Sequence, residues 1–295
     1  NCVRPEPYRV WHYYNQEANL AQSFDIEINK LSAPRKLPRP SLKLSKDEKL
    51  NGVITMNEVK KMTGKDKVVI IQPFGRGIDY RDGVFNDSTS RSIDYSNLVS
   101  LIQKFQKKGY ATMVMAEMQI DFGSEQFTVP IPQPHGITLR QWSGLIKAAD
   151  LFVGCDSVGQ HIAYATETPV VAVIASTYPV NISYPNDDKV KIIDLGETSR
   201  RYAPIRIAPD ESTDRMNDGI NEMSNKQEDD IIKAGVDLVK KFPHKEDVKL
   251  AKLKGEGEQQ QGQVCPVHGV VHDHGQMHQH QPMQMPQQPM PTPAS

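Results

Sequence analysis

The chain has 295 residues with 35 basic and 36 acidic side chains, which gives a formal net charge of −1. Because the two signs are interspersed, we expect no nucleic-acid partner and no anionic lipid surface. No apolar run of about 18 residues and no basic leader with an apolar core is present, so the sequence predicts neither a transmembrane segment nor a signal peptide. The cysteines, Cys2, Cys155 and Cys265, are odd in number and far apart. This pattern argues against a disulfide framework and favours a cytoplasmic protein.

Residues 1–66 do not have the pattern of an independent domain. Residues 8–24 are rich in aromatic side chains and predict one helix. Pro34, Pro38 and Pro40 follow and favour extended backbone. Residues 45–50, with four consecutive charged side chains, predict a short exposed helix. We therefore interpret residues 1–66 as a connector.

Residues 67–243 alternate short apolar runs with amphipathic helices, which is typical of βαβ units around a mainly parallel sheet. We predict strands at residues 68–71, 111–116, 151–154, 170–174 and 190–193. We predict helices at residues 93–108, after a Thr138 cap, at 159–166 and after Ser224, whose spacing from Gln227 is that of a capping box. The sequence thus predicts an α/β, doubly wound, Rossmann-like domain over residues 67–243.

The segment 244–295 has a different composition from the rest of the chain. From Lys254 onward it is rich in Gly, Gln, His, Met and Pro and poor in aliphatic residues, so we expect a low-complexity, disordered tail. Cys265 and His268 are potential metal ligands, but a zinc site needs four donors held at a folded spacing. We therefore predict no metal site, and a role for the tail in binding a protein partner is left open.

Ligands of open α/β sheets bind beyond the carboxyl ends of the strands, so the loops after the predicted strands are the candidate sites. In the loop 72–77, Gly75 lets backbone amides approach a ligand and Arg76 offers a guanidinium suited to phosphate. The alternative is a flexible turn with a solvated arginine, because the spacing matches neither common phosphate-loop fingerprint. Glu117, which follows the second strand, is a further candidate.

The loop 156–161 lies between a buried strand and a short helix. Amides at a helix N-terminus bind anions, and Ser157, Val158 and Gly159 stand at this position. The Asp156 carboxylate is better suited to sugar hydroxyls than to phosphate. The alternative is that Asp156 or Ser157 caps the helix. His161 lies in the first helical turn, where the dipole favours a neutral ring.

The loop 175–179 and Cys155 each have an ordinary structural interpretation beside a functional one. The loop 175–179 after the fourth strand carries hydroxyls and an aromatic ring that could line the same crevice, although such residues are also common in turns. Cys155 lies inside a strand and has no adjacent base, so we interpret it as a small core residue and not as a nucleophile.

The order of these parts resembles the C-terminal domain of glycosyltransferase family 9, the bacterial heptosyltransferase family. Residues 149–161 read ADLFVGCDSVGQH and residues 168–174 read TPVVAVI. They are similar to the family pattern of a strand ending in Asp, a loop Asp-Thr-Gly-Pro-x-His and a second strand. Residues 69–75 and the helix from Met223 to Leu238 resemble the flanking elements. The resemblance covers about 170 residues.

The resemblance implies the donor-binding half of a two-domain GT-B enzyme that is inverting and independent of metals and cofactors. In that family the domain holds a nucleotide-diphosphate sugar, with amides near Ser157 on the diphosphate and Asp156 on the sugar. Arg76 or Arg91 would offset phosphate charge. The acceptor would be a glycan or a lipid-linked saccharide.

The chain also departs from the family pattern. Val158 and Gly159 replace the Gly-Pro pair, which moves the glycine by one position. Residues 1–66 are too few for the acceptor-binding domain, of which they would be a remnant, and no catalytic base is identified. Two alternatives therefore stay open: a non-catalytic adaptor that keeps the fold and uses its tail for interactions, and a nucleotide-sugar epimerase.

Overall fold

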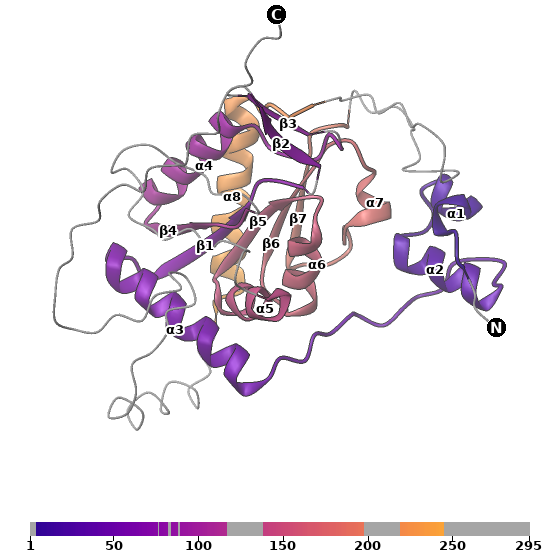
Figure 1. Cartoon of the computed structure of the whole chain (residues 1–295), viewed down its shortest axis with the longest axis horizontal. Coiled ribbons are helices and arrows are strands. Elements are labelled where there is room, and N and C mark those ends of the chain that lie inside the picture. Colours follow the sequence, from indigo (N-terminus) through magenta and orange to yellow (C-terminus); the bar gives the residue numbers. More distant parts are fainter. Residues whose placement is uncertain are drawn as a thin grey trace, which may run out of the picture.

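A computed structural model describes residues 4–75, 77–81, 84–87, 89–116, 138–197 and 219–244, without the side chain of Arg81. Five parallel strands form the central sheet, namely β1 (Lys67–Gln72), β4 (Tyr110–Val114), β5 (Leu151–Cys155), β6 (Val170–Ile174) and β7 (Val190–Asp194). Their order is β4-β1-β5-β6-β7, so the direction of winding reverses between β1 and β5 (Figure 1). This arrangement confirms the predicted doubly wound α/β fold.

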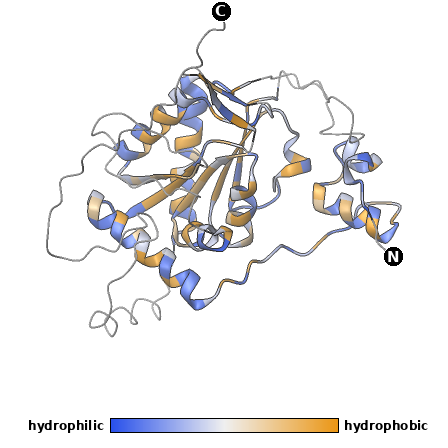
Figure 2. Ribbon diagram, in the orientation of Figure 1, coloured by the Kyte–Doolittle hydropathy of each residue, from blue (hydrophilic) through white to orange (hydrophobic). Residues whose placement is uncertain are grey.

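Helices cover both faces of the sheet. One face carries α4 (Tyr95–Lys107) and α8 (Asn225–Lys241), and the other carries α3 (Lys46–Thr63), α5 (Leu139–Ala148) and α6 (Val158–Ala165). Val69 and Ile71 of β1 pack toward the first pair, whereas Val68 and Ile70 pack into the second core. Both sides of β1, β4, β5 and β6 are buried, so these strands are mostly apolar runs, as Figure 2 shows, whereas β7 is only partly buried.

The predicted helix starts at Thr138 and Ser224 are confirmed. The Thr138 hydroxyl accepts a hydrogen bond from the Gln141 amide, and the Gln141 side chain accepts one from the Thr138 amide. Ser224 and Gln227 form the same reciprocal pair at the start of α8. Both are capping boxes, in which two backbone donors at the helix end are satisfied by side chains.

The prediction of a short exposed helix at residues 45–50 is wrong, because α3 continues to Thr63 and packs onto the sheet. Met56 and Val59 are buried in the core beneath it. Gly52 faces the backbone of Gly144 in α5, and a Cβ on either glycine would overlap the facing helix. This close approach explains why helical glycines stand in both elements. We propose that the folding unit begins near Ser45, and not at Lys67.

The N-terminal segment also differs from its prediction of one helix over residues 8–24. It forms η1 (Pro7–Arg9), α1 (Trp11–Tyr14) and α2 (Leu20–Asn29), because a capping box of Asn19 with Gln22 starts a new helix. The Asn181 side chain of α7 (Pro179–Ile182) donates to the carbonyl oxygens of Tyr13 and Ala18 at 3.0 and 2.8 Å. The N-terminal helices are therefore tied to the loop region after β6.

A hairpin that the sequence analysis did not predict follows β1. Its strands are β2 (Ile78–Arg81) and β3 (Val84–Asp87), paired antiparallel. Phe85 stacks on Phe74 and on Tyr95 with ring centroids 5.3 and 5.5 Å apart, which holds the hairpin against the domain. No helix in the described ranges is long and apolar enough to cross a membrane.

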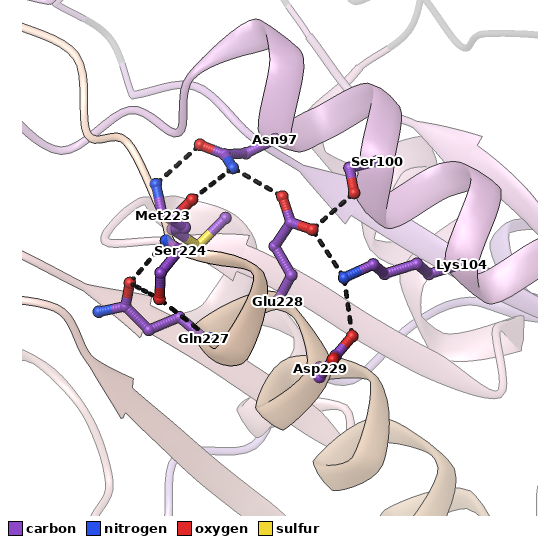
Figure 3. A network of polar contacts seen from close by, with 8 residues as sticks. All are labelled: Asn97, Ser100, Lys104, Met223, Ser224, Gln227, Glu228 and Asp229. Carbon is purple, nitrogen blue, oxygen red and sulfur yellow. Dashed lines mark hydrogen bonds and ion pairs between the residues drawn. The ribbon is translucent and has the colours of Figure 1, made fainter.

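A polar network joins α4 to α8 (Figure 3). The buried Glu228 carboxylate accepts hydrogen bonds from Asn97 Nδ2 at 2.6 Å and Ser100 Oγ at 2.5 Å, and it pairs with Lys104 Nζ at 2.8 Å. Asn97 Oδ1 also accepts from the Met223 amide at 2.8 Å. The network therefore fixes both the start and the first turns of α8.

Glu228→Ala is expected to lower the free energy of unfolding by about 2–3 kcal/mol, since it removes a charged acceptor from buried donors. Urea unfolding at pH 7 measures this loss. Asp229→Asn is the matched control: Asp229 pairs with the same Lys104 but is 70% exposed, so its loss is expected to cost about 0.5 kcal/mol. Equal effects of the two changes would contradict a special role for Glu228.

The same network gives a pH dependence. Burial opposes ionisation of Glu228, but the hydrogen bonds from Lys104, Ser100 and Asn97 outweigh it and hold the carboxyl pKa below its ordinary value. The contribution to stability is therefore present above the unfolded pKa and is lost as the pH falls through the lowered folded pKa.

Candidate functional site

The loops that follow β1 and β5 meet where the strand order reverses. Gln72, the last residue of β1, is 5% exposed. Its side-chain amide forms two hydrogen bonds to the start of α6. Its Nε2 donates to Ser157 Oγ at 3.1 Å, and its Oε1 accepts from the Gly159 amide at 3.1 Å. One side chain thus fixes the position of the two loops relative to each other. Reversal points of this kind are where open α/β sheets bind ligands.

Asp156 lies at the carboxyl end of β5 and is 5% exposed. Thr177 Oγ1, from the loop after β6, donates to Oδ2 at 2.9 Å, and Gln160 Nε2 donates to Oδ1 at 3.3 Å. No cation pairs with this carboxylate within the part of the chain that the structure describes. Two neutral donors leave acceptor capacity on a buried carboxylate, which further hydrogen-bond donors can use.

The loop after β3 is organised by Asp87, which is fully buried. Its carboxylate accepts hydrogen bonds from the amides of Thr89, Arg91 and Ser92 and from the Thr89 and Ser92 hydroxyls. Burial would raise the pKa of Asp87, but the donors on Ser92 and Thr89 outweigh it and leave the pKa below its ordinary value. The carboxylate therefore stays ionised and holds the loop rigidly.

This loop is hydrogen-bonded to the loop after β1 and to the loop after β6. Ser92 Oγ accepts from the Gly75 amide at 2.9 Å, and Ser176 Oγ donates to the Thr89 carbonyl at 3.2 Å. Arg91 is half-buried, and its Nε donates to Thr89 Oγ1 at 3.0 Å. Its terminal guanidinium nitrogens make no hydrogen bond to the residues that the structure describes. They are thus available to an anion near Gly75. A Cβ placed on this glycine would lie 3.6 Å from Arg91 Nε.

Two residues near Asp156, Cys155 and His161, have shifted side-chain pKa values. Burial, together with the Asp156 carboxylate, raises the pKa of the Cys155 thiol well above its usual range, so Cys155 stays a protonated core residue. Burial lowers the pKa of His161, although the charge of Asp156 acts in the opposite sense. His161 Nδ1 lies 2.8 Å from the hydroxyl of Tyr184. The expectation of a neutral His161 agrees with this environment.

The structure brings together most, but not all, of the candidate residues from the sequence. In the loops that follow β1, β3 and β5 and in the first turn of α6 it places Gly75, Arg91, Asp156, Ser157, Val158, Gly159 and His161. Arg76 and Glu117, which were also predicted, lie outside the described residues. Ser157 stands at the N-cap of α6 but forms no side-chain cap. The alternative that Ser157 merely caps the helix is therefore wrong.

The expectation for Gly159 needs a correction. We expected Gly159 to permit close approach of a ligand, but its Cα faces the protein, where a Cβ would overlap Gln72 Oε1 and the Phe152 ring. Its backbone amide already donates a hydrogen bond to Gln72 Oε1 and is not free for a ligand. The glycine therefore accommodates the Gln72 bridge.

Sequence reasoning missed Asp87, and it included Gln72 and Thr177 in candidate loops without identifying the contacts that they make. For Asp87 a local signal exists, since an Asp followed two residues later by Thr favours a side-chain-stabilised turn. For Gln72 and Thr177 the partners lie 85 and 21 residues away, so no local pattern identifies them.

Comparison with known proteins supports the resemblance found in the sequence. Residues 99–202 match the family model of glycosyltransferase family 9 (heptosyltransferase). This region contains β4, β5, α6, β6 and β7, and thus the Asp156 loop. The resemblance to this family is confirmed over residues 99–202. A search of curated proteins gave no match.

Several solved structures are similar to the chain. They include the Escherichia coli ADP-heptose lipopolysaccharide heptosyltransferase II, at 16% identity and a TM-score of 0.48 over 72% of this chain and 56% of that one. A family 9 glycosyltransferase from Veillonella parvula matches at 12% identity and a TM-score of 0.46, over 65% of this chain and 51% of that one. The chain thus spans about half the length of these proteins.

Gly159→Ala is expected to lower the free energy of unfolding by about 1–3 kcal/mol, because the new methyl group collides with Gln72 and Phe152. Thermal or urea unfolding measures the loss. Gly75→Ala is the matched control, since its Cβ would meet nothing closer than 3.6 Å and the change should be nearly neutral. A neutral Gly159→Ala would show that Gln72 is not packed against α6.

Proposed function

We propose that the crevice at the carboxyl ends of β1, β5 and β6 binds a nucleotide-diphosphate sugar and that the chain serves as the donor-binding part of a heptosyltransferase-like glycosyltransferase. The observation that carries this proposal is the Asp156 loop. It lies at the reversal of strand order and within the region that matches the family model. The transferred sugar would go to a glycan or to a lipid-linked saccharide.

The chemistry of Asp156 suits a sugar. A buried carboxylate with two neutral donors and unused acceptor capacity is stabilised by further hydroxyl donors, and sugar hydroxyls supply them without bringing a second negative charge. A phosphate at the same place would instead be repelled by the carboxylate. We therefore assign Asp156 to the sugar.

The diphosphate has two sources of positive potential nearby. Ser157 does not cap the start of α6 with its own side chain, and the Gly159 amide is taken by Gln72 Oε1, so the amides of Ser157 and Val158 are the ones that can face a phosphate. The second source is the Arg91 guanidinium, whose Nε would lie 3.6 Å from a Cβ placed on Gly75. A cation at this position would stabilise the charge that develops on a departing nucleoside diphosphate.

Transfer also needs an acceptor site and a general base, and neither is assigned to a residue of this chain. In the two-domain architecture that the resemblance implies, these belong to a second domain that faces the donor crevice. We propose that the complete activity requires such a domain. We also propose a cytoplasmic location for the protein and a role for residues 244–295 in binding a protein partner.

Isothermal titration with ADP-, UDP- and GDP-sugars and with the matching free diphosphates tests the donor site. Asp156→Asn keeps the shape of the side chain and should weaken binding of the preferred nucleotide sugar by about tenfold, because a charged acceptor is worth about 1.5–3 kcal/mol. Binding of the free diphosphate should change much less, since it lacks the sugar.

Asp188→Asn is the control for the loss of one negative charge, because Asp188 is 82% exposed and pairs with Lys241. It should leave both affinities unchanged. Equal losses for the sugar nucleotide and the free diphosphate in Asp156→Asn would rule out the sugar contact. No binding by the parent protein to any member of the panel would reject the proposed function.

A further inference from the structure

A column of stacked side chains leads from Arg39 in the extended N-terminal segment to His161 in the first turns of α6. The Arg39 guanidinium lies 4.1 Å from the centroid of the Tyr164 ring. The Tyr164 and Tyr184 rings stack with centroids 3.5 Å apart and an interplanar angle of 12°. The Tyr184 hydroxyl lies 2.8 Å from His161 Nδ1. The column therefore ends on a residue in the first turns of α6, next to the Asp156 loop.

The outer end of this column is firmly held. Arg39 Nη1 pairs with Asp187 Oδ2 at 2.7 Å, and Nη2 donates to the Tyr164 carbonyl oxygen at 2.9 Å. Arg39 and Tyr184 both lie over the Tyr164 ring at short distance, so they occupy its two opposite faces. A cation and an aromatic ring on the two faces of a tyrosine are both favourable contacts. The position of the Tyr184 ring is thereby fixed.

The contact between the Tyr184 hydroxyl and His161 Nδ1 couples the direction of their hydrogen bond to the tautomer of the imidazole. Burial raises the pKa of Tyr184 to about 12, so the hydroxyl keeps its proton at neutral pH. Burial also lowers the pKa of His161, against the opposing effect of Asp156, so the ring is neutral. When the phenol donates to Nδ1, the imidazole proton must reside on Nε2. Nε2 makes no hydrogen bond to other residues in the described ranges.

We propose that Tyr184, held by Tyr164 and Arg39, positions His161 as the Nε2–H tautomer and so supplies a neutral hydrogen-bond donor to an oxygen of the ligand in the crevice. The ligand contact rests on the proposed function, whereas the tautomer does not. Tyr184, Tyr164 and Arg39 are positioning residues, because they act through His161.

The tautomer can be measured directly by long-range ¹H–¹⁵N NMR of the histidine rings, with His161→Gln to identify the His161 signals. The parent protein should show a protonated Nε2 and an unprotonated Nδ1 at His161. Tyr184→Phe keeps the stacked ring but removes the hydroxyl, and it should shift His161 to a mixture of tautomers. A protonated Nδ1 in the parent protein, or identical spectra for Tyr184→Phe, would overturn the proposal.

Tyr164→Phe is the matched control. It also removes one hydroxyl from the same stack and keeps the ring, but its hydroxyl is not the one that contacts His161. The His161 signals should therefore stay as in the parent protein. An equal change in both variants would mean that general loosening of the column, and not the Tyr184 hydroxyl, controls the imidazole.

Titration with ADP as the probe tests the ligand contact. We expect the His161 Nε2 signal to move on binding, and we expect Tyr184→Phe to weaken ADP binding about fivefold, the size of effect expected for one neutral hydrogen bond. Unchanged affinity in Tyr184→Phe would reject the ligand contact and leave the proposed function standing. If ADP and the other nucleoside diphosphates fail to bind the parent protein, the proposed function and the ligand contact both fall, while the spectra still decide the tautomer.

Discussion

The burial of both faces of the sheet is the constraint on which the rest of the structure depends. Strands β1, β5 and β6 have no face toward solvent, so their interior positions carry apolar side chains. Polar groups can stand only where a strand ends, and there a buried group must find a partner. Gln72 and Asp156 are in this position, and each is bonded to a loop from a neighbouring strand. The gathering of polar side chains at the carboxyl ends of these strands is thus a consequence of how the sheet is covered.

These contacts also preorganise the loops that follow β1, β3 and β6. The Asp87 loop, the Gly75 loop and the loop after β6 are joined by the Ser92 and Ser176 hydroxyls. Since the loops are fixed by bonds within the protein, a ligand would not have to order them on binding, and that saves part of the entropic cost of association. Among the described residues of these loops, the groups with unused hydrogen-bonding capacity include the Arg91 guanidinium, the first amides of α6, the Asp156 carboxylate and one imidazole nitrogen. This set combines two anion-binding groups with two that suit hydroxyl or ester oxygens.

The sequence predicted the parts of the structure that depend on local pattern. The strand at Val170–Ile174 and the helix caps at Thr138 and Ser224 follow from apolar runs and from spacing within a few residues. The packing of α3 was missed, because its charged first turn hides a buried face whose partner, α5, lies far along the chain. The same limit applies to Gln72 and Tyr184. Their roles come from partners brought near by the tertiary fold, and no spacing rule contains that information.

The resemblance and the geometry converge on the same loop by separate routes. The family model covers residues 99–202, whereas Gln72, Gly75 and Arg91 lie outside that range and are joined to the Asp156 loop only in the folded chain. The most direct test is a crystal structure of the chain with the tightest-binding nucleotide-diphosphate sugar. The account predicts the diphosphate between Gly75 and the start of α6, with a sugar hydroxyl on Asp156. A ligand bound elsewhere on the chain, with the crevice unchanged, would contradict it.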